Sequence, residues 1–208
     1  EMFMGLVGSE MCIRDRLLGA AFGSSGERCM ALSVAVAVGD EVADLLVQKL
    51  SKSMKNLKFG AYTDSTNDFG PVITKQHQQS VINHISSAEK QGANIVVDGR
   101  DAIVRGYENG FYVGGTLIDK VTPQMDSYKA EIFGPVLQIV RVATMKDAMS
   151  LIDNHEYGNG TCIFTRDGEA ARYFSDHIKV GMVGVNIPLP VPVAYHSFGG
   201  WKRSLFGD

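Results

Sequence analysis

Cys29 is the residue of this sequence best placed for nucleophilic chemistry. It lies in a glycine-rich turn within residues 22–33, directly after Arg28 and shortly before an apolar run at residues 34–38. A thiol at the point where a turn enters a buried strand is held by the scaffold and open to a cleft. Backbone N–H groups of residues 23–26 could steady a thiolate or an oxyanion, and Arg28 adds positive charge if its side chain turns inward. A buried, inert cysteine is the alternative, and local physics leaves the two readings about even.

A second candidate pair, Glu131 and Phe133, stands just before the break Gly134-Pro135 and an apolar run. In an extended segment, side chains at this spacing point the same way. The carboxylate could then accept hydrogen bonds from a ribose while the aromatic ring lies against a planar ligand. The pattern alone favours the plainer interpretation, which is an exposed glutamate beside a core phenylalanine.

The other residues capable of chemistry indicate no further site. Cys162 lies in an apolar run and is expected in the core. The five histidines are scattered, and neither His-x3-His nor Cys-x2-Cys spacing occurs, so no metal site is expected. No Gly-x-Gly-x-x-Gly motif or P-loop is present. If the activity uses a dinucleotide, its main binding fold must therefore lie outside this chain.

Composition excludes several classes of function. The chain has 208 residues, 45% of them hydrophobic, and a formal net charge of −3. That charge gives no electrostatic case for nucleic acid or an anionic membrane as a partner. No apolar run approaches the roughly 20 residues that span a bilayer. The three cysteines are unevenly spaced and odd in number, which favours a reduced, intracellular compartment over a disulfide framework.

The elements that must position these residues alternate between strand and helix patterns. Strands are expected at residues 31–38, 94–97, 111–118, 136–142, 162–165 and 182–186, and helices at residues 17–22, 41–54, 74–91, 146–154 and 169–178. The tail at residues 188–208 has the composition of a loop. This alternation predicts an α/β layer structure with a mainly parallel sheet.

The N-terminal residues fit the rest of the chain poorly. Residues 5–16 show no helix or strand period and resemble a translated sequencing-adapter read more than a natural segment. We therefore expect residues 1–16 to be a non-native leader. The remainder, residues 17–208, contains no repeat or linker and is expected to form one domain.

Four motifs together resemble the aldehyde dehydrogenase superfamily. They are the Cys29 turn, the segment at residues 131–136, Gly184-Val185-Asn186, and Ser197-Phe198-Gly199-Gly200, which occur in the order and at roughly the spacings of that superfamily. Within it, Gly-Glu-Arg-Cys-Met-Ala-Leu-Ser and Val-Gly-Val-Asn-Ile-Pro-Leu-Pro-Val-Pro are similar to the CoA-acylating methylmalonate-semialdehyde dehydrogenases. The resemblance covers residues 17–208 and implies the three-layer αβα catalytic domain of this fold. It also implies that the nucleotide-binding domain and a C-terminal oligomerisation segment are missing.

The resemblance assigns roles residue by residue. Cys29 matches the nucleophile, which forms a thiohemiacetal and then a thioester, with its own N–H as one oxyanion donor. Glu131 matches the carboxylate that binds the nicotinamide ribose, and Phe133 matches the aromatic that positions the nicotinamide of NAD. Phe198 matches an aromatic at the substrate tunnel. The family's second oxyanion donor and its general-base position lie upstream of this chain.

At Arg28 this sequence departs from the common hydrolytic members of the superfamily, and the departure indicates a class of substrate. A guanidinium beside the nucleophile can grip a second carboxylate, and malonate semialdehyde and methylmalonate semialdehyde both carry one. The resemblance implies that coenzyme A then takes the acyl group as acetyl-CoA or propionyl-CoA, with loss of CO2. A hydrolytic dehydrogenase for another acidic semialdehyde and a non-catalytic homologue remain the alternatives.

The same resemblance sets expectations for the full-length protein. A homo-oligomer, dimer or tetramer, is implied, with a small semialdehyde substrate and neither nucleic acid nor membrane as partner. The tail at residues 193–203 is more similar to the bacterial branch, which favours the cytoplasm, or the mitochondrion if the source is eukaryotic. Residues 1–208 alone are expected to be inactive, because no dinucleotide-binding motif is present.

Overall fold

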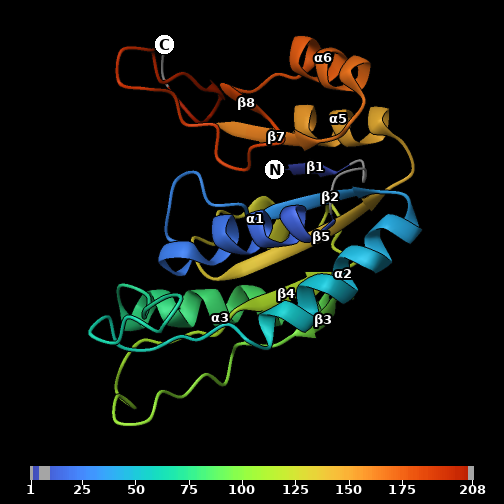
Figure 1. Ribbon diagram of the computed structural model, residues 1–208. Coiled ribbons are helices and arrows are strands. Elements are labelled where there is room, and N and C mark those ends of the chain that lie inside the picture. The colour runs from blue at the N-terminus through green and yellow to red at the C-terminus, as the bar shows by residue number, and fades with distance from the viewer. Residues whose placement is uncertain (1, 5–9, 206–208) are drawn as a thin grey trace.

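The computed structural model describes residues 2–4 and 10–205, and its elements alternate along the chain much as the sequence pattern predicts (Figure 1). The strands are β1 (Met2–Met4), β2 (Val34–Val38), β3 (Asn94–Val97), β4 (Thr116–Asp119), β5 (Val136–Val142), β6 (Tyr157–Gly158), β7 (Gly160–Phe164), β8 (Met182–Val185) and β9 (Trp201–Lys202). The helices are α1 (Glu10–Phe22), α2 (Asp40–Met54), α3 (Lys75–Lys90), α4 (Asp126–Lys129), α5 (Met145–Asn154) and α6 (Gly168–His177), with the short helical turn η1 (Gly23–Gly26) after α1.

Among the described residues, seven strands form one sheet in the order β3-β4-β5-β2-β1-β7-β8. Every neighbouring pair is parallel except β3 and β4, which run antiparallel at one edge. A single antiparallel edge strand is common in sheets of this kind. The prediction of a mainly parallel sheet is confirmed.

Helices cover both faces of the sheet, and the alternation of side chains in β2 shows why. Val34 and Val36 belong to a core cluster with residues of α3, α5 and α6, whereas Ala35 and Ala37 belong to a second cluster with residues of α1 and α2. Successive strand residues point to opposite faces, so a continuous apolar strand buries both. The expected three-layer αβα arrangement is confirmed, and Figure 1 shows α1 and α2 together on one side of the sheet.

Three features differ from the sequence expectations. Strand β4 begins only at Thr116, later than the run expected at residues 111–118. Just before it, the Gly114 N–H donates to the Gly99 carbonyl at 2.8 Å, and a Cβ at Gly99 would lie 2.0 Å from the Gly114 oxygen. Helix α4 precedes the connection at residues 130–133. The tail also contributes β9, which pairs antiparallel with β6. In the described part of the chain, no helix is long and apolar enough to cross a membrane.

The N-terminal residues are only partly described. Met2–Met4 pairs with β2 and β7, and α1 begins at Glu10, so the helix expected at residues 17–22 starts earlier than predicted. Ile13, inside the expected leader, is buried in the core cluster that α1 and α2 share. This burial argues against a leader that extends as far as residue 16. Residues 5–9 lie outside the described residues, and the leader stays a prediction.

Candidate active site

Cys29 is exposed on the turn that links η1 to β2. The preceding turn is tightly wound, since Ser24, Ser25 and Gly26 all have positive φ angles, of 53°, 58° and 70°. Left-handed backbone is unfavourable for residues other than glycine, so the surrounding structure must hold it. One such restraint is the Ser25 hydroxyl, which donates to the carbonyl of Gly70 at 2.7 Å.

The turn packs directly against the segment that carries Glu131 and Phe133. A Cβ on Gly26 would lie 2.1 Å from the carbonyl oxygen of Gly134, and a Cβ on Gly134 would lie 2.7 Å from Val81 of α3. Only glycines allow two backbones to approach this closely. This three-way contact between η1, the Phe133 segment and α3 brings the two sequence motifs together.

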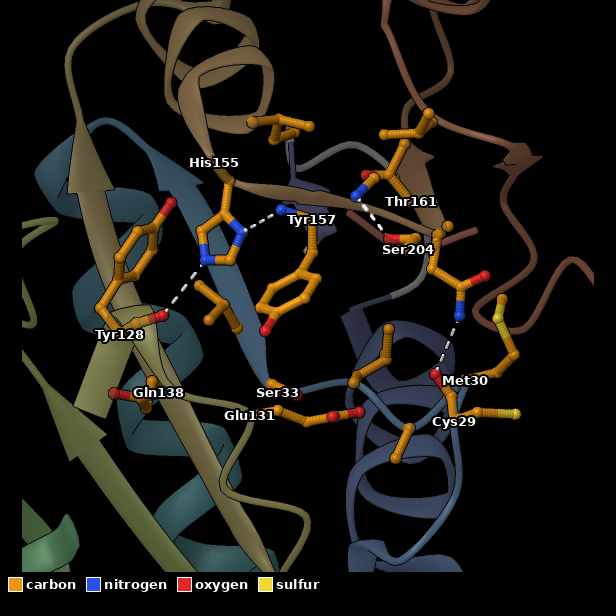
Figure 2. A pocket seen from close by; sticks show the side chains of 18 of the residues that line it. Cys29, Met30, Ser33, Tyr128, Glu131, Gln138, His155, Tyr157, Thr161 and Ser204 are labelled. Carbon is orange, nitrogen blue, oxygen red and sulfur yellow. Dashed lines mark hydrogen bonds between the residues drawn. The ribbon is translucent and has the colours of Figure 1, made fainter. Parts of the chain in front are cut away.

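Two cavities open beside Cys29. A small one, of about 30 Å³, is lined by Cys29 together with Arg28, Glu131 and Phe133. A larger one, of about 370 Å³, shares Cys29 and Glu131 and extends between β2, β5 and β7 toward the tail. Figure 2 shows Glu131 extending toward the turn that carries Cys29. The structure therefore places four of the five predicted site residues around one hollow.

Glu131 and Phe133 are both available to a ligand. Glu131 is exposed, and among the described residues no hydrogen bond or ion pair holds its carboxylate. Phe133 leaves 37% of its surface exposed, and its φ of 54° is left-handed. A solvated carboxylate can accept from ribose hydroxyls, and an exposed ring can lie against a nicotinamide. These residues therefore fit the ribose and nicotinamide end of a dinucleotide, and the plainer interpretation of Phe133 as a core residue is wrong.

Arg28 is oriented differently from the simplest expectation. Its Nε donates to the Ser24 hydroxyl at 3.1 Å, and its guanidinium lies over Gly23, so the side chain folds back along the turn. Within the part of the chain that the structure describes, Arg28 makes no ion pair. The guanidinium still lines the small cavity with Cys29, and its charge is free to meet an anionic ligand there.

Phe198 is the predicted residue that lies apart from the others. It is 41% exposed in the tail and lines neither cavity beside Cys29. The tail from residue 186 to residue 200 contains no helix and no strand. The structure therefore does not bring Phe198 to the cavities beside Cys29, and its tunnel role stays a prediction.

Sequence reasoning missed the residues that support the Cys29 turn from the other side. The Asn159 amide donates to the carbonyl oxygen of Cys29 at 3.2 Å, and Gly160 contacts the end of Met30. His155 lines the larger cavity, where its Nδ1 accepts from the N–H of Tyr157 at 3.1 Å and its Nε2 lies 3.3 Å from the Tyr128 carbonyl (Figure 2). No local motif marks these residues, because Asn159 and His155 join Cys29 at the larger cavity only in the folded sheet, where β7 pairs with β1 and β8.

Cys162 lies in β7 and is fully buried, which confirms its predicted core position. Burial raises the pKa of its thiol to about 12. A thiol with so high a pKa is unreactive near neutral pH, because the thiolate is the nucleophile. Of these two cysteines, only Cys29 is exposed to a reagent. Among the described residues, no group of three or more His, Cys, Asp and Glu side chains could hold a metal ion.

The sequence model of the aldehyde dehydrogenase family matches residues 13–208. The chain belongs to the aldehyde dehydrogenase family. A malonate-semialdehyde dehydrogenase of Pseudomonas aeruginosa is 66% identical to it over 192 residues, which are 92% of this chain and 39% of that protein. The human mitochondrial methylmalonate-semialdehyde/malonate-semialdehyde dehydrogenase [acylating] is 47% identical over 93% of this chain and 36% of that protein.

A solved structure supports the same aldehyde dehydrogenase fold. A Sinorhizobium meliloti structure complexed with NAD is 55% identical, with a TM-score of 0.97 over 100% of this chain and 42% of that chain. This aldehyde dehydrogenase chain thus spans about 40% of the length of the relatives it matches. The predicted family and fold are both confirmed.

Proposed function

We propose that this chain is the nucleophile-bearing part of an NAD-dependent, CoA-acylating malonate/methylmalonate-semialdehyde dehydrogenase. The observation that carries the proposal is the small cavity, where Cys29, Arg28, Glu131 and Phe133 converge from two segments far apart in sequence. The similarity to malonate- and methylmalonate-semialdehyde dehydrogenases over more than nine tenths of the chain supports the substrate class.

Cys29 is the proposed site of covalent chemistry. Its thiolate attacks the aldehyde carbon to give a thiohemiacetal, and the N–H of Cys29 donates to the oxyanion. NAD, when bound, supplies the hydride acceptor at Glu131 and Phe133. Loss of hydride from the thiohemiacetal carbon leaves an acyl thioester on the Cys29 sulfur.

Arg28 is the proposed anchor for the second carboxylate of the substrate. Its guanidinium can hold that carboxylate with paired N–H donors while the aldehyde carbon meets the thiolate. The bond between this carboxylate and the α-carbon then breaks, CO2 leaves, and the α-carbon takes a proton. Coenzyme A, after losing its thiol proton to solvent, attacks the remaining thioester through its thiolate, which releases acetyl-CoA or propionyl-CoA and regenerates the Cys29 thiolate.

The acyl acceptor separates this proposal from its nearest alternative. The full-length protein should form NADH from malonate semialdehyde much faster with coenzyme A than without it. An equal rate without coenzyme A would instead identify a hydrolytic dehydrogenase. Activity that survives Cys29→Ala would overturn the mechanism, whereas loss of activity in that variant also argues against a non-catalytic homologue.

The same proposal extends to the full-length protein around this chain. We infer a longer protein with a separate nucleotide-binding domain and an oligomerisation segment, because the chain spans 39% of the Pseudomonas aeruginosa relative. A homo-oligomer is part of this inference. The 66% identity to the Pseudomonas aeruginosa relative supports a bacterial source and the cytoplasm.

A further inference from the structure

His77 connects the two segments that form the candidate active site. It lies in the first turn of α3, where its backbone N–H donates to the side chain of the N-cap residue Thr74 at 3.1 Å. Its imidazole Nε2 is 2.7 Å from the carbonyl oxygen of Phe133 and 3.5 Å from Oε1 of Glu27. Because a carbonyl oxygen can only accept, the geometry assigns the imidazole proton to Nε2.

Glu27 completes the connection from the nucleophile side. It stands next but one before Cys29, and its Oε1 also accepts from the backbone N–H of Ile73 at 3.2 Å, just before α3 begins. The side chains of Glu27 and His77 are only 17% and 23% exposed. The carboxylate therefore fixes the start of α3 relative to the Cys29 turn.

Phe133 is the part of this arrangement that needs support. Its φ of 54° is left-handed, a conformation that costs a residue other than glycine roughly 1–2 kcal/mol. The hydrogen bond from His77 holds the carbonyl of this strained residue, and Val81 of the same helix contacts Gly134 next to it. Strained backbone persists only where surrounding contacts determine it, and it often marks a functional position.

We propose that His77 is a positioning residue for the reaction, acting through Phe133 and Glu27. Its Nε2–H sets the orientation of the Phe133 segment relative to the Cys29 turn, and so the placement of nicotinamide relative to the sulfur. This inference rests on the proposed function, because it assigns the nicotinamide to Phe133. Misplacement by about 1 Å can lower a rate about 100-fold, so a restraint of this kind affects the reaction without touching the substrate.

The test uses three variants of the full-length protein. His77→Ala removes the donor, whereas His77→Gln retains an N–H donor at about the reach of Nε2. His84→Ala is the matched control, since His84 lies two turns farther along α3 and is likewise half-buried. Without NAD, amide hydrogen exchange of Val136, whose N–H donates to the Gly134 carbonyl at 2.7 Å beside the Phe133 segment, should accelerate about tenfold in His77→Ala and stay near wild type in the other two.

Ligand binding and turnover give the second readout. The dissociation constant for NADH, from fluorescence titration, should rise about tenfold in His77→Ala, and kcat should fall by about 10- to 100-fold. His77→Gln should recover both to within about threefold. Unchanged exchange and NADH affinity in His77→Ala would overturn the proposal, as would equal losses in His77→Gln or in His84→Ala.

The two proposals fail in different ways. If wild-type protein does not oxidise malonate semialdehyde, the proposed function is wrong, yet hydrogen exchange and NADH titration still report on His77. If wild type is active and His77→Ala equals it in exchange, NADH binding and turnover, only the positioning role is wrong.

Discussion

The contact between Gly26 and Gly134 gives the sharpest quantitative prediction, for Gly26→Ala. A Cβ at Gly26 would lie 2.1 Å from the Gly134 carbonyl oxygen and 2.6 Å from its carbon, both of them backbone atoms that cannot rotate away. Gly26 also has a φ of 70°. Left-handed backbone costs alanine about 1–2 kcal/mol, and overpacking typically costs about 1–3 kcal/mol. Reduced freedom of the unfolded chain returns about 0.4–1 kcal/mol, which leaves a net loss of about 1–5 kcal/mol, about 3 kcal/mol at the middle of the range.

Two matched glycines separate these contributions. Gly92, just after α3, has a φ of 99°, and no atom lies within 4 Å of the position that a Cβ would take there, so Gly92→Ala carries the backbone cost alone, about 1 kcal/mol. Gly168 is equally open and has no positive φ, so Gly168→Ala should be neutral or slightly stabilising. Urea denaturation of the full-length variants, followed by circular dichroism, measures the three changes in unfolding free energy.

The same substitution should affect activity more than stability. Because the contact sets the distance between the Cys29 turn and the Phe133 segment, Gly26→Ala should lower kcat/KM by about 100-fold, while both control variants stay near wild type. A stability loss no larger than that of Gly92→Ala would refute the proposed clash. Wild-type turnover in Gly26→Ala would refute the view that this contact aligns the site.

Four further predictions address other parts of the chain. Iodoacetamide at neutral pH should label exposed Cys29 well before buried Cys162, as read by peptide mass mapping; equal labelling would contradict the burial of Cys162. Burial raises the pKa of the Cys162 thiol from an ordinary 9.0 to about 12. Between pH 9 and pH 12 the unfolded chain therefore binds fewer protons at Cys162 than the folded chain does. The free energy of unfolding should therefore keep its full value below pH 9 and decrease toward pH 12 more steeply in wild type than in Cys162→Ala. Parallel profiles of unfolding free energy against pH would exclude Cys162 as the cause of the decrease. Asn159→Ala removes the donor to the Cys29 carbonyl and should lower kcat about tenfold, whereas exposed Asn154→Ala should not; equal kcat values would show that the bond is dispensable. Lys202→Met removes the ammonium that donates to the carbonyls of Ile152, Asp153 and His155, and should cost about 2 kcal/mol of unfolding free energy, against almost none for the exposed Lys146→Met.

The sequence alone determined the layers of the fold and indicated Cys29 as the candidate nucleophile. The apolar run at β2 predicts a strand buried on both faces, and the helical stripes on α2 and α3 predict its cover, because these patterns are periodic and local. Cys29, Glu131 and Phe133 were identified through motifs whose meaning came from the family resemblance. The local sequence pattern alone assigned Phe133 to the core, whereas the structure leaves 37% of its surface exposed.

Only the tertiary structure decided how the site is assembled. Gly26 meets Gly134, His77 bonds Phe133 and Glu27, and Asn159 bonds Cys29, yet each pair is distant in sequence and carries no periodic signal. Arg28 shows the same limit, because its position beside Cys29 did not reveal that it folds back onto Ser24. Hydrogen bonds and close backbone contacts depend on angles and distances that the packing of β2, β5 and α3 sets. The candidate residues can therefore be named from the sequence, whereas their distances and orientations follow only from the fold.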